Sequence, residues 1–188
     1  MLLSRHAVHM TTRFLCVLML ATVARISPAA SADNNVTPQL QPLAFLAGQC
    51  WSGPFPGGKA TDEHCFEWVY GGRFLRDRHI VRGGENPYRG ETLYYWDPAE
   101  KAIAYIYFNS DGGVSRGNAR VDGDTLVFPS ERHTLEGGAV REYGTTWKRE
   151  GEDRYVAVTS ELKDGKWHEA WRVDFRRAGP VSDAEWLK

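Results

Sequence analysis

The chain has 188 residues, of which 42% are hydrophobic and 25% charged, with a formal net charge of −1. This length fits a single domain with short appendages. The charge balance lacks the basic excess that nucleic-acid binding requires, so no nucleic-acid partner is expected.

Residues 1–32 have the three parts of a secretory signal peptide. Arg5 and Arg13 precede an apolar run of eleven residues at 14–24, and Ala-Ser-Ala at 30–32 matches a cleavage site. The run is too short to span a bilayer, which takes about 20 apolar residues. We therefore predict cleavage after Ala32, export to the periplasm or the medium, and no integral membrane span. Without the leader, 20 Lys and Arg oppose 24 Asp and Glu.

Two cysteines remain beyond the predicted leader, Cys50 and Cys65. In an oxidising compartment an isolated pair of this kind favours a disulfide. The chain has no C-x-x-C pair, and two cysteines without neighbouring ligands do not indicate a zinc site. We predict a Cys50–Cys65 disulfide and no metal.

The first part of the exported chain is polar and then apolar. Residues 33–41 show no periodicity and predict a flexible lead-in. Pro42 suits the first turn of a short helix, and Gly48 suits its C-terminal cap. The helical turn is therefore expected over 42–48.

Beyond Trp51, short aromatic and β-branched runs alternate with glycine-rich turns, which is the pattern of an all-β protein. About ten strands are expected, near 50–55, 62–70, 73–82, 89–96, 101–109, 114–121, 124–129, 140–149, 154–163 and 166–177.

The short connections join neighbouring antiparallel strands, and a sheet of this width removes its edges by closing. We therefore predict an antiparallel up-and-down β-barrel, with a two-sheet sandwich as the alternative. Gly179-Pro180 ends the last strand, and Ser182 and Glu185 form a capping box for a short C-terminal helix. Residues 42–188 form the single predicted domain.

Strand alternation predicts which residues face inward. His64, Phe66 and Trp68 share one face of their strand, Tyr143 lies on an aromatic face, and Glu169 and Trp171 share a face of the last strand. Aromatic side chains with a few polar groups fit a ligand cavity, although the same aromatics can fill a solid core. Glu169, among tryptophans, is the expected buried carboxylate.

Arginines are the second class of candidate. Arg76 and Arg78 share a face with Phe74 and Ile80, which favours at least one inward arginine. This face is either a solvated row of cross-strand ion pairs or the place where an inward arginine holds an anion. In 114–121 the inward row is either Arg116 with Asn118 or the row of small residues that alternates with them. The predicted ligand-binding residues are His64, Phe66, Trp68, Arg78, Arg116, Tyr143, Glu169 and Trp171.

No catalytic residue is predicted. Gly113 to Gly117 match the G-x-S-x-G pattern, but no helix follows and no βα alternation exists. His64, Glu169 and an arginine would support acid–base chemistry only if they converge in one pocket.

Three segments, FLAGQCWSG, YGGRFLRDR and GETLYYWDPAEKAIAYIYFNSDGG, resemble the small lipocalin-like (calycin) barrels of uncharacterised function that many bacteria export. The resemblance implies a barrel over nearly all of the exported chain. The architecture also resembles the nitrobindin-type barrel, which binds haem through a histidine near its C-terminal strand. Here Ala170 takes that position and His168 lies two residues earlier in the chain, so no cofactor is expected.

Three alternative functions are consistent with these sequence features. The first is an exported protein that binds a small hydrophobic or amphipathic molecule in the barrel without chemistry. The second is an isomerase, cyclase or hydrolase that uses the same cavity. The third is a filled barrel that serves as a structural or partner-binding module, with an exposed apolar patch. The ligand and the oligomeric state stay open.

Overall fold

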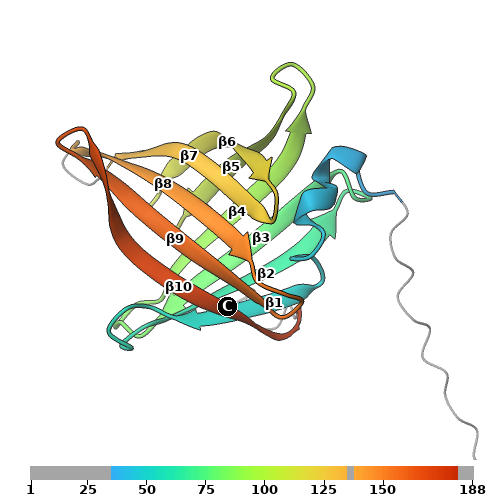
Figure 1. The fold of residues 1–188 in the computed structure, drawn as a ribbon. Coiled ribbons are helices and arrows are strands. Elements are labelled where there is room, and N and C mark those ends of the chain that lie inside the picture. The colour runs from blue at the N-terminus through green and yellow to red at the C-terminus, as the bar shows by residue number, and fades with distance from the viewer. Residues whose placement is uncertain (1–34, 135–137, 182–188) are drawn as a thin grey trace, which may run out of the picture. The chain divides into compact units, whose positions relative to one another are not determined.

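The computed structural model describes residues 35–134 and 138–181. In these residues the chain forms one 3-10 helix and ten antiparallel strands that close into a barrel, which confirms the predicted fold class (Figure 1). The elements are η1 (Pro38–Leu43), β1 (Gln49–Pro54), β2 (Thr61–Val69), β3 (Phe74–Arg82), β4 (Tyr88–Asp97), β5 (Ala102–Asn109), β6 (Val114–Asp122), β7 (Thr125–Thr134), β8 (Val140–Arg149), β9 (Arg154–Lys163) and β10 (Lys166–Pro180).

Each strand pairs with the next along the chain, and β1 pairs with β10 to close the barrel. The β2–β3 connection shows why the chain reverses so sharply. Tyr70, Gly71 and Gly72 all have positive φ, of 51°, 64° and 79°, and glycine adopts this region without steric cost. This tight turn sets the register in which His64 of β2 lies opposite His79 of β3.

Helix η1 begins earlier than the sequence suggests. It starts at Pro38, and the side chains of Leu40, Leu43 and Leu46 are fully buried. The backbone N–H of Thr37 donates to the carbonyl of Gly72 at 3.0 Å, which holds the helix entry against the β2–β3 turn. The prediction of a flexible lead-in up to residue 41 is therefore wrong from Pro38 onward, because Leu40 belongs to the core.

Two predictions lie outside the described residues. They are the signal peptide at 1–32 and the C-terminal helix after Ser182. Within the described residues, none of the helical structure has the length and hydropathy that crossing a membrane takes.

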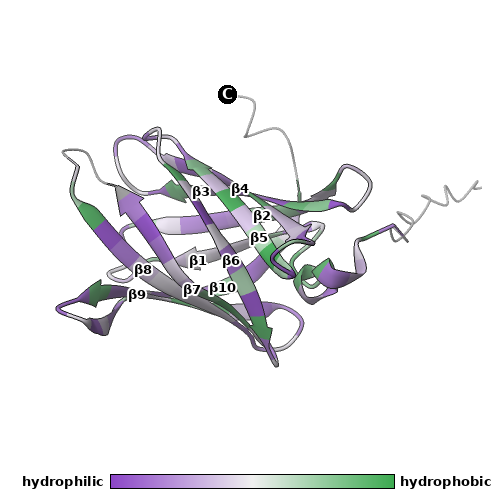
Figure 2. Cartoon of the chain, turned by 90° about the horizontal axis from the view of Figure 1, so that it is seen from above, coloured by the Kyte–Doolittle hydropathy of each residue, from purple (hydrophilic) through white to green (hydrophobic). Residues whose placement is uncertain are grey.

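Helix η1 lies next to one end of the barrel (Figure 1), and its leucines belong to a buried apolar cluster that includes Trp51, Phe66 and Tyr155. Trp51 is fully buried, its indole N–H donates to the carbonyl of Leu46 at 3.1 Å, and its ring lies 5.3 Å from that of Tyr155. Phe66 and Leu75 complete this packing and are also fully buried. Hydrophilic and hydrophobic stretches alternate along the strands, as a half-buried sheet requires (Figure 2).

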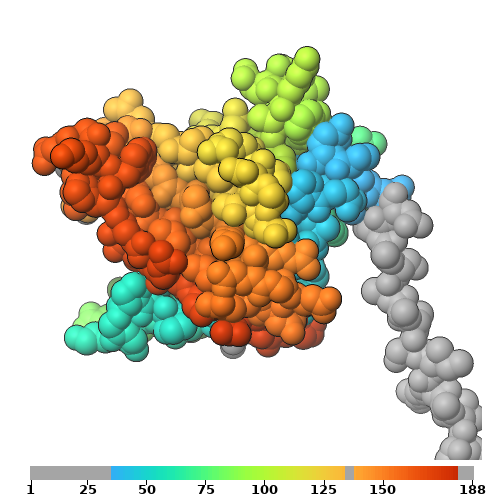
Figure 3. Space-filling model, in the orientation of Figure 1, coloured from blue at the N-terminus to red at the C-terminus, as the bar shows by residue number. Residues whose placement is uncertain are grey.

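Of three register shifts in the barrel, two are β-bulges that change the direction of side chains near the cavity. One lies in β7 between Phe128 and Glu131, and the other in β10 between Glu169 and Trp171. A bulge inserts one unpaired residue and shifts the alternation of faces beyond it. The first bulge contains Pro129, which cannot donate to the ladder. Strands β8, β9 and β10 form much of the face seen in Figure 3.

The predicted disulfide is present between Cys50 and Cys65, which are paired directly across β1 and β2 with their Cα atoms 4.0 Å apart. It ties the first strand of the barrel to the second.

We expect the double variant Cys50→Ala/Cys65→Ala to unfold at a lower temperature. The bridge closes a loop with a sequence separation of 15. Loss of such a loop constraint costs about 3 kcal/mol, and in a domain of this size that lowers Tm by about 6–12 °C. Differential scanning calorimetry of the variant and of the oxidised wild type measures the change. An unchanged Tm would show that the bridge does not stabilise the fold.

Candidate functional site

The barrel contains a cavity of ≈ 500 Å³. This volume lies in the range of small-molecule sites. The residues that line it are Phe55, Asp62, His64, Asp77, His79, Val81, Tyr88, Thr92, Tyr94, Tyr105, Tyr107, Phe128, Glu131, His133, Tyr143, Thr145, Trp147, Ala157, Thr159, Trp171, Val173 and Phe175.

The cavity has two chemically different walls. Strands β8 to β10 supply an apolar wall that includes Trp147, Trp171 and Phe175. Strands β2 to β5 supply a polar wall of carboxylates, imidazoles and phenols. Among the described residues, three carboxylates and three histidines line the cavity and no lysine or arginine does.

His64 is the centre of the polar wall. Its Nδ1 lies 3.0 and 2.9 Å from the two carboxylate oxygens of Asp77, and its Nε2 lies 3.2 Å from Oδ2 of Asp62. An imidazole donates from both ring nitrogens only when it is protonated. Burial alone would lower the pKa of His64, but the charges of Asp77 and Asp62 and their hydrogen bonds raise it to about 10.

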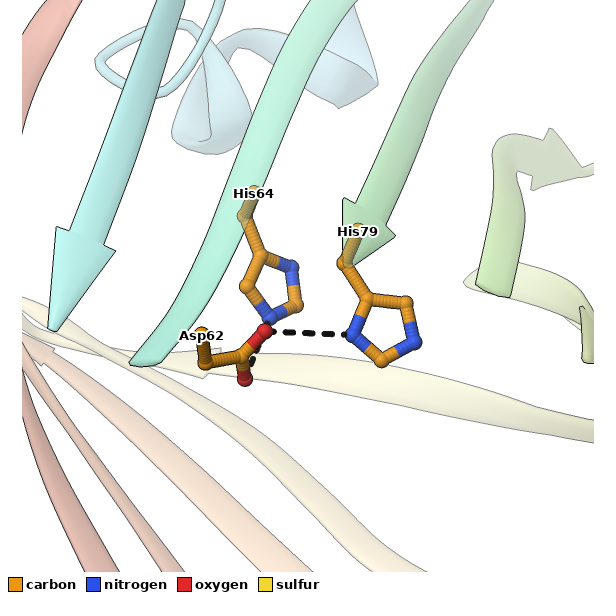
Figure 4. A group of neighbouring side chains, drawn as sticks. All are labelled: Asp62, His64 and His79. Atoms are coloured by element: carbon orange, nitrogen blue, oxygen red, sulfur yellow. Dashed lines mark hydrogen bonds and ion pairs between the residues drawn. The ribbon is translucent and has the colours of Figure 1, made fainter. Parts of the chain in front are cut away.

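Asp62 connects His64 to the second imidazole, His79 (Figure 4). Nδ1 of His79 lies 3.4 Å from Oδ1 of Asp62, and the two imidazole rings are 4.7 Å apart. Burial alone would raise the pKa of Asp62, but the charge of His64 and hydrogen bonds from both imidazoles lower it well below its usual value.

The polar wall continues from His79 to two tyrosines. Nε2 of His79 lies 3.1 Å from the hydroxyl of Tyr107, which in turn lies 2.5 Å from the hydroxyl of Tyr88. Burial raises the pKa of Tyr107 well above its usual value, so it keeps its proton. The contact between His79 and Tyr107 depends on Gly90, since a Cβ there would lie 2.2 Å from Nε2 of His79.

A second pair of titratable side chains faces the cavity from β7. Nε2 of His133 lies 3.1 Å from Oε1 of Glu131. Burial alone would raise the pKa of Glu131, but hydrogen bonds with His133 and Ser115 lower it. The β7 bulge brings Glu131 inward, and the sequence analysis missed it because the predicted strand ended at residue 129.

Five of the eight predicted residues lie inside the barrel. His64, Tyr143 and Trp171 line the cavity, Phe66 is fully buried in the core, and Trp68 packs against the core while partly buried. Whether any of them binds a ligand stays a prediction.

The inward placement of Glu169 is wrong. The β10 bulge lies between Glu169 and Trp171, so Glu169 falls on the outer face while Trp171 lines the cavity. Its carboxylate is exposed and accepts a hydrogen bond from Nη2 of Arg172 at 2.9 Å. His64, Glu169 and an arginine therefore do not converge, and acid–base chemistry on these residues has no geometric basis.

The inward placement of Arg78 is also wrong. Asp77 and His79 occupy the inner face of β3, and Arg78 on the outer face forms an ion pair with Glu67 at 2.9 Å. The alternation along β3 does not distinguish its faces, since each carries two apolar residues, Phe74 and Ile80 on one face and Leu75 and Val81 on the other. The register of the β2–β3 hairpin identifies the inward face of β3. Residues paired across two strands share a face, so an inward His64 implies an inward His79.

Arg116 is exposed, and the small residues of β6 face inward. The packing of β5 gives the reason. A Cβ at Gly117 would lie 2.5 Å from the hydroxyl of Tyr105, so this position has to be glycine for the tyrosine to fit. Ser115 and Ala119 on the same face are buried. The prediction of Arg116 as an inward ligand-binding residue is therefore wrong.

Comparisons with known proteins bear on the fold. No family model matches the chain, and a search of curated proteins finds no match. Among solved structures, Rv2717c from M. tuberculosis is similar with a TM-score of 0.51 at 16% sequence identity, over 76% of this chain and 99% of that one. This likeness supports the ten-stranded barrel fold.

We predict that Gly90→Ala destabilises the protein and separates His79 from Tyr107. The added methyl group would lie 2.2 Å from Nε2 of His79 and 2.5 Å from the ring of Tyr107. Overpacking of this kind costs about 1–3 kcal/mol. Urea unfolding of this variant and of Gly84→Ala, where a Cβ has only one atom within 4 Å, measures the effect. Equal stability of the two variants would contradict the packing described.

We predict that His64 remains protonated through neutral pH. Its pKa is raised in the folded state, from 6.5 to about 10. The resulting stabilisation is fully present below about pH 6.5 and is lost as the pH rises toward 10. An NMR titration of the His64 ring, with exposed His168 as the internal comparison, measures the midpoint. A His64 midpoint at or below 7 would contradict the arrangement with Asp62 and Asp77.

Proposed function

We propose that the protein binds a neutral or cationic amphipathic small molecule inside the barrel. The observation that carries this proposal is the composition of the cavity, with an apolar wall on one side and a polar wall on the other. An amphipathic molecule would place its hydrocarbon part against Trp147 and Trp171 and its polar group against Asp62 and His79.

The charge of the cavity favours this ligand class over an anion. Asp62, Asp77 and Glu131 supply carboxylates, and no lysine or arginine among the described residues lines the cavity. The protonated His64 is already paired with Asp62 and Asp77, so an anionic head group would meet carboxylates without an unpaired lysine or arginine in the described lining, and desolvating it there is costly. A fatty acid or another carboxylate is therefore a poor ligand.

Two alternatives have less support. A filled barrel would leave no space for a ligand, whereas this barrel has a cavity of ≈ 500 Å³. An enzyme that uses His64 with Glu169 and an arginine would need side chains that lie on opposite sides of the barrel wall. Ligand binding without catalysis requires only the side chains that line the cavity.

We also infer that the protein is exported and lipocalin-like. The disulfide between Cys50 and Cys65 supports an oxidising compartment. The single-chain up-and-down barrel, with a short helix against one end, supports the lipocalin-like assignment.

A matched ligand series tests the charge preference. Decylamine, decanol and decanoate share one alkyl chain and differ in their head groups. We expect the amine and the alcohol to bind at least about tenfold more tightly than the acid, which corresponds to about 1.4 kcal/mol. Isothermal titration calorimetry measures the affinities, and the fluorescence of Trp147 and Trp171 gives an independent readout. Preferred binding of decanoate would overturn the proposal.

A pair of variants tests the location. Thr159 lines the cavity, and neighbouring Val158 is half-buried on the outer face of β9. We expect Thr159→Phe to abolish binding of decylamine by filling the cavity, and Val158→Phe to retain it. Equal binding by both variants would place the ligand elsewhere. Native mass spectrometry of protein purified from its own host would then identify the natural ligand.

A further inference from the structure

We propose that Asp62, His64 and His79 form a binding site for a divalent transition-metal ion such as Zn²⁺ on the polar wall of the cavity. One carboxylate and two imidazoles converge here from adjacent strands β2 and β3 (Figure 4). Their ligand atoms all lie within 4.8 Å of one another. The proposal concerns the same cavity as the proposed function but does not depend on it.

The distances fit a metal ion with little rearrangement. Zinc binds histidine nitrogen and carboxylate oxygen at about 2.0–2.2 Å, so two ligand atoms of a tetrahedral site lie about 3.4 Å apart. Nε2 of His64 lies 3.2 Å from one oxygen of Asp62, and Nδ1 of His79 lies 3.4 Å from the other. Since the three ligand atoms lie within 4.8 Å of one another, the side chains have to move closer together to share one ion, and the cavity beside them gives room for this movement.

The other nitrogen of each imidazole already has the partner that a metal-bound histidine requires. Nδ1 of His64 faces the carboxylate of Asp77, which is 2% exposed, and Nε2 of His79 faces the hydroxyl of Tyr107. Such hydrogen bonds fix the ring orientation and the tautomer of metal ligands. They direct Nε2 of His64 and Nδ1 of His79 toward Asp62.

Charge also favours a cation at this position. The wall holds two buried carboxylates, Asp62 and Asp77, and the described lining has no lysine or arginine to compete with a metal. Nε2 of His64 has to lose any proton it carries before it binds an ion, because a metal-bound imidazole nitrogen is deprotonated. A site with three protein ligands on one wall leaves a coordination position open toward the cavity, where water or a ligand donor atom binds.

Zinc titration tests the site directly. Protein purified without a polyhistidine tag and treated with a chelator is titrated with Zn²⁺ in a calorimeter. We expect one ion per chain, and Co²⁺ in place of zinc should give visible absorption bands of a nitrogen-ligated ion. Failure to bind one ion per chain would overturn the proposal.

Variants locate the ion. We expect His64→Gln and His79→Gln to weaken zinc binding by at least about a hundredfold, and the positioning variant Asp77→Asn to weaken it by about 10–100-fold. His133→Gln changes a histidine of the same cavity outside the three ligands and should bind zinc as the wild type does. Unchanged affinity in a folded His79→Gln, or equal loss in His133→Gln, would overturn the assignment. Circular dichroism establishes that each variant is folded, and His79→Gln suffices alone if His64→Gln does not fold.

The alkyl series separates this inference from the proposed function. Titrations with decylamine and decanol are repeated on the zinc-free and the zinc-loaded protein. Zinc binding without binding of either ligand would refute the proposed function and leave the metal site standing. Binding of decylamine or decanol without zinc binding would refute the metal site and leave the proposed function standing.

Discussion

The contact of His64 with Asp62 and Asp77 is the interaction on which the rest of the cavity depends. Burying two carboxylates is costly unless each is paired and hydrogen-bonded, and the imidazole between them supplies both pairings. This requirement fixes the His64 ring and gives the inner faces of β2 and β3 their polarity. His79 is positioned in turn by Asp62 on one side and Tyr107 on the other.

The cavity exists because the two ends of the barrel are packed differently. Leu40, Leu43 and Leu46 join Trp51 at the end next to η1 and fill it with apolar side chains. Toward the other end the inward residues are carboxylates, imidazoles and phenols, which cannot interdigitate as hydrocarbon side chains do without losing their hydrogen bonds. The space left between them and the aromatic wall is therefore the natural place for an amphipathic ligand, and its polar wall the natural place for a cation.

Two bulges and one hairpin account for the differences between the predicted and observed site. A bulge moves every residue beyond it to the other face. A prediction that assumes strict alternation of faces along a strand does not include this one extra residue. This is why Glu169 was expected inside and lies outside, and why Glu131 was missed. In β3 both faces carry two apolar residues, so hydrophobicity alone does not identify the inward face. The pairing of His64 with His79 does identify it. The hairpin glycines contained that information, since they set the register.

The sequence by itself determined the strand succession, the closed antiparallel barrel, the disulfide and the inward face of β2. These follow from local alternation, turn residues and composition, which act over a few residues. Only the tertiary structure decided that β3 turns Asp77 and His79 inward, that the described lining of the cavity holds carboxylates without arginine, and that β2 to β5 give the cavity a polar wall. These properties depend on register and on bulges, which are set by packing between strands rather than by any one strand's own residues.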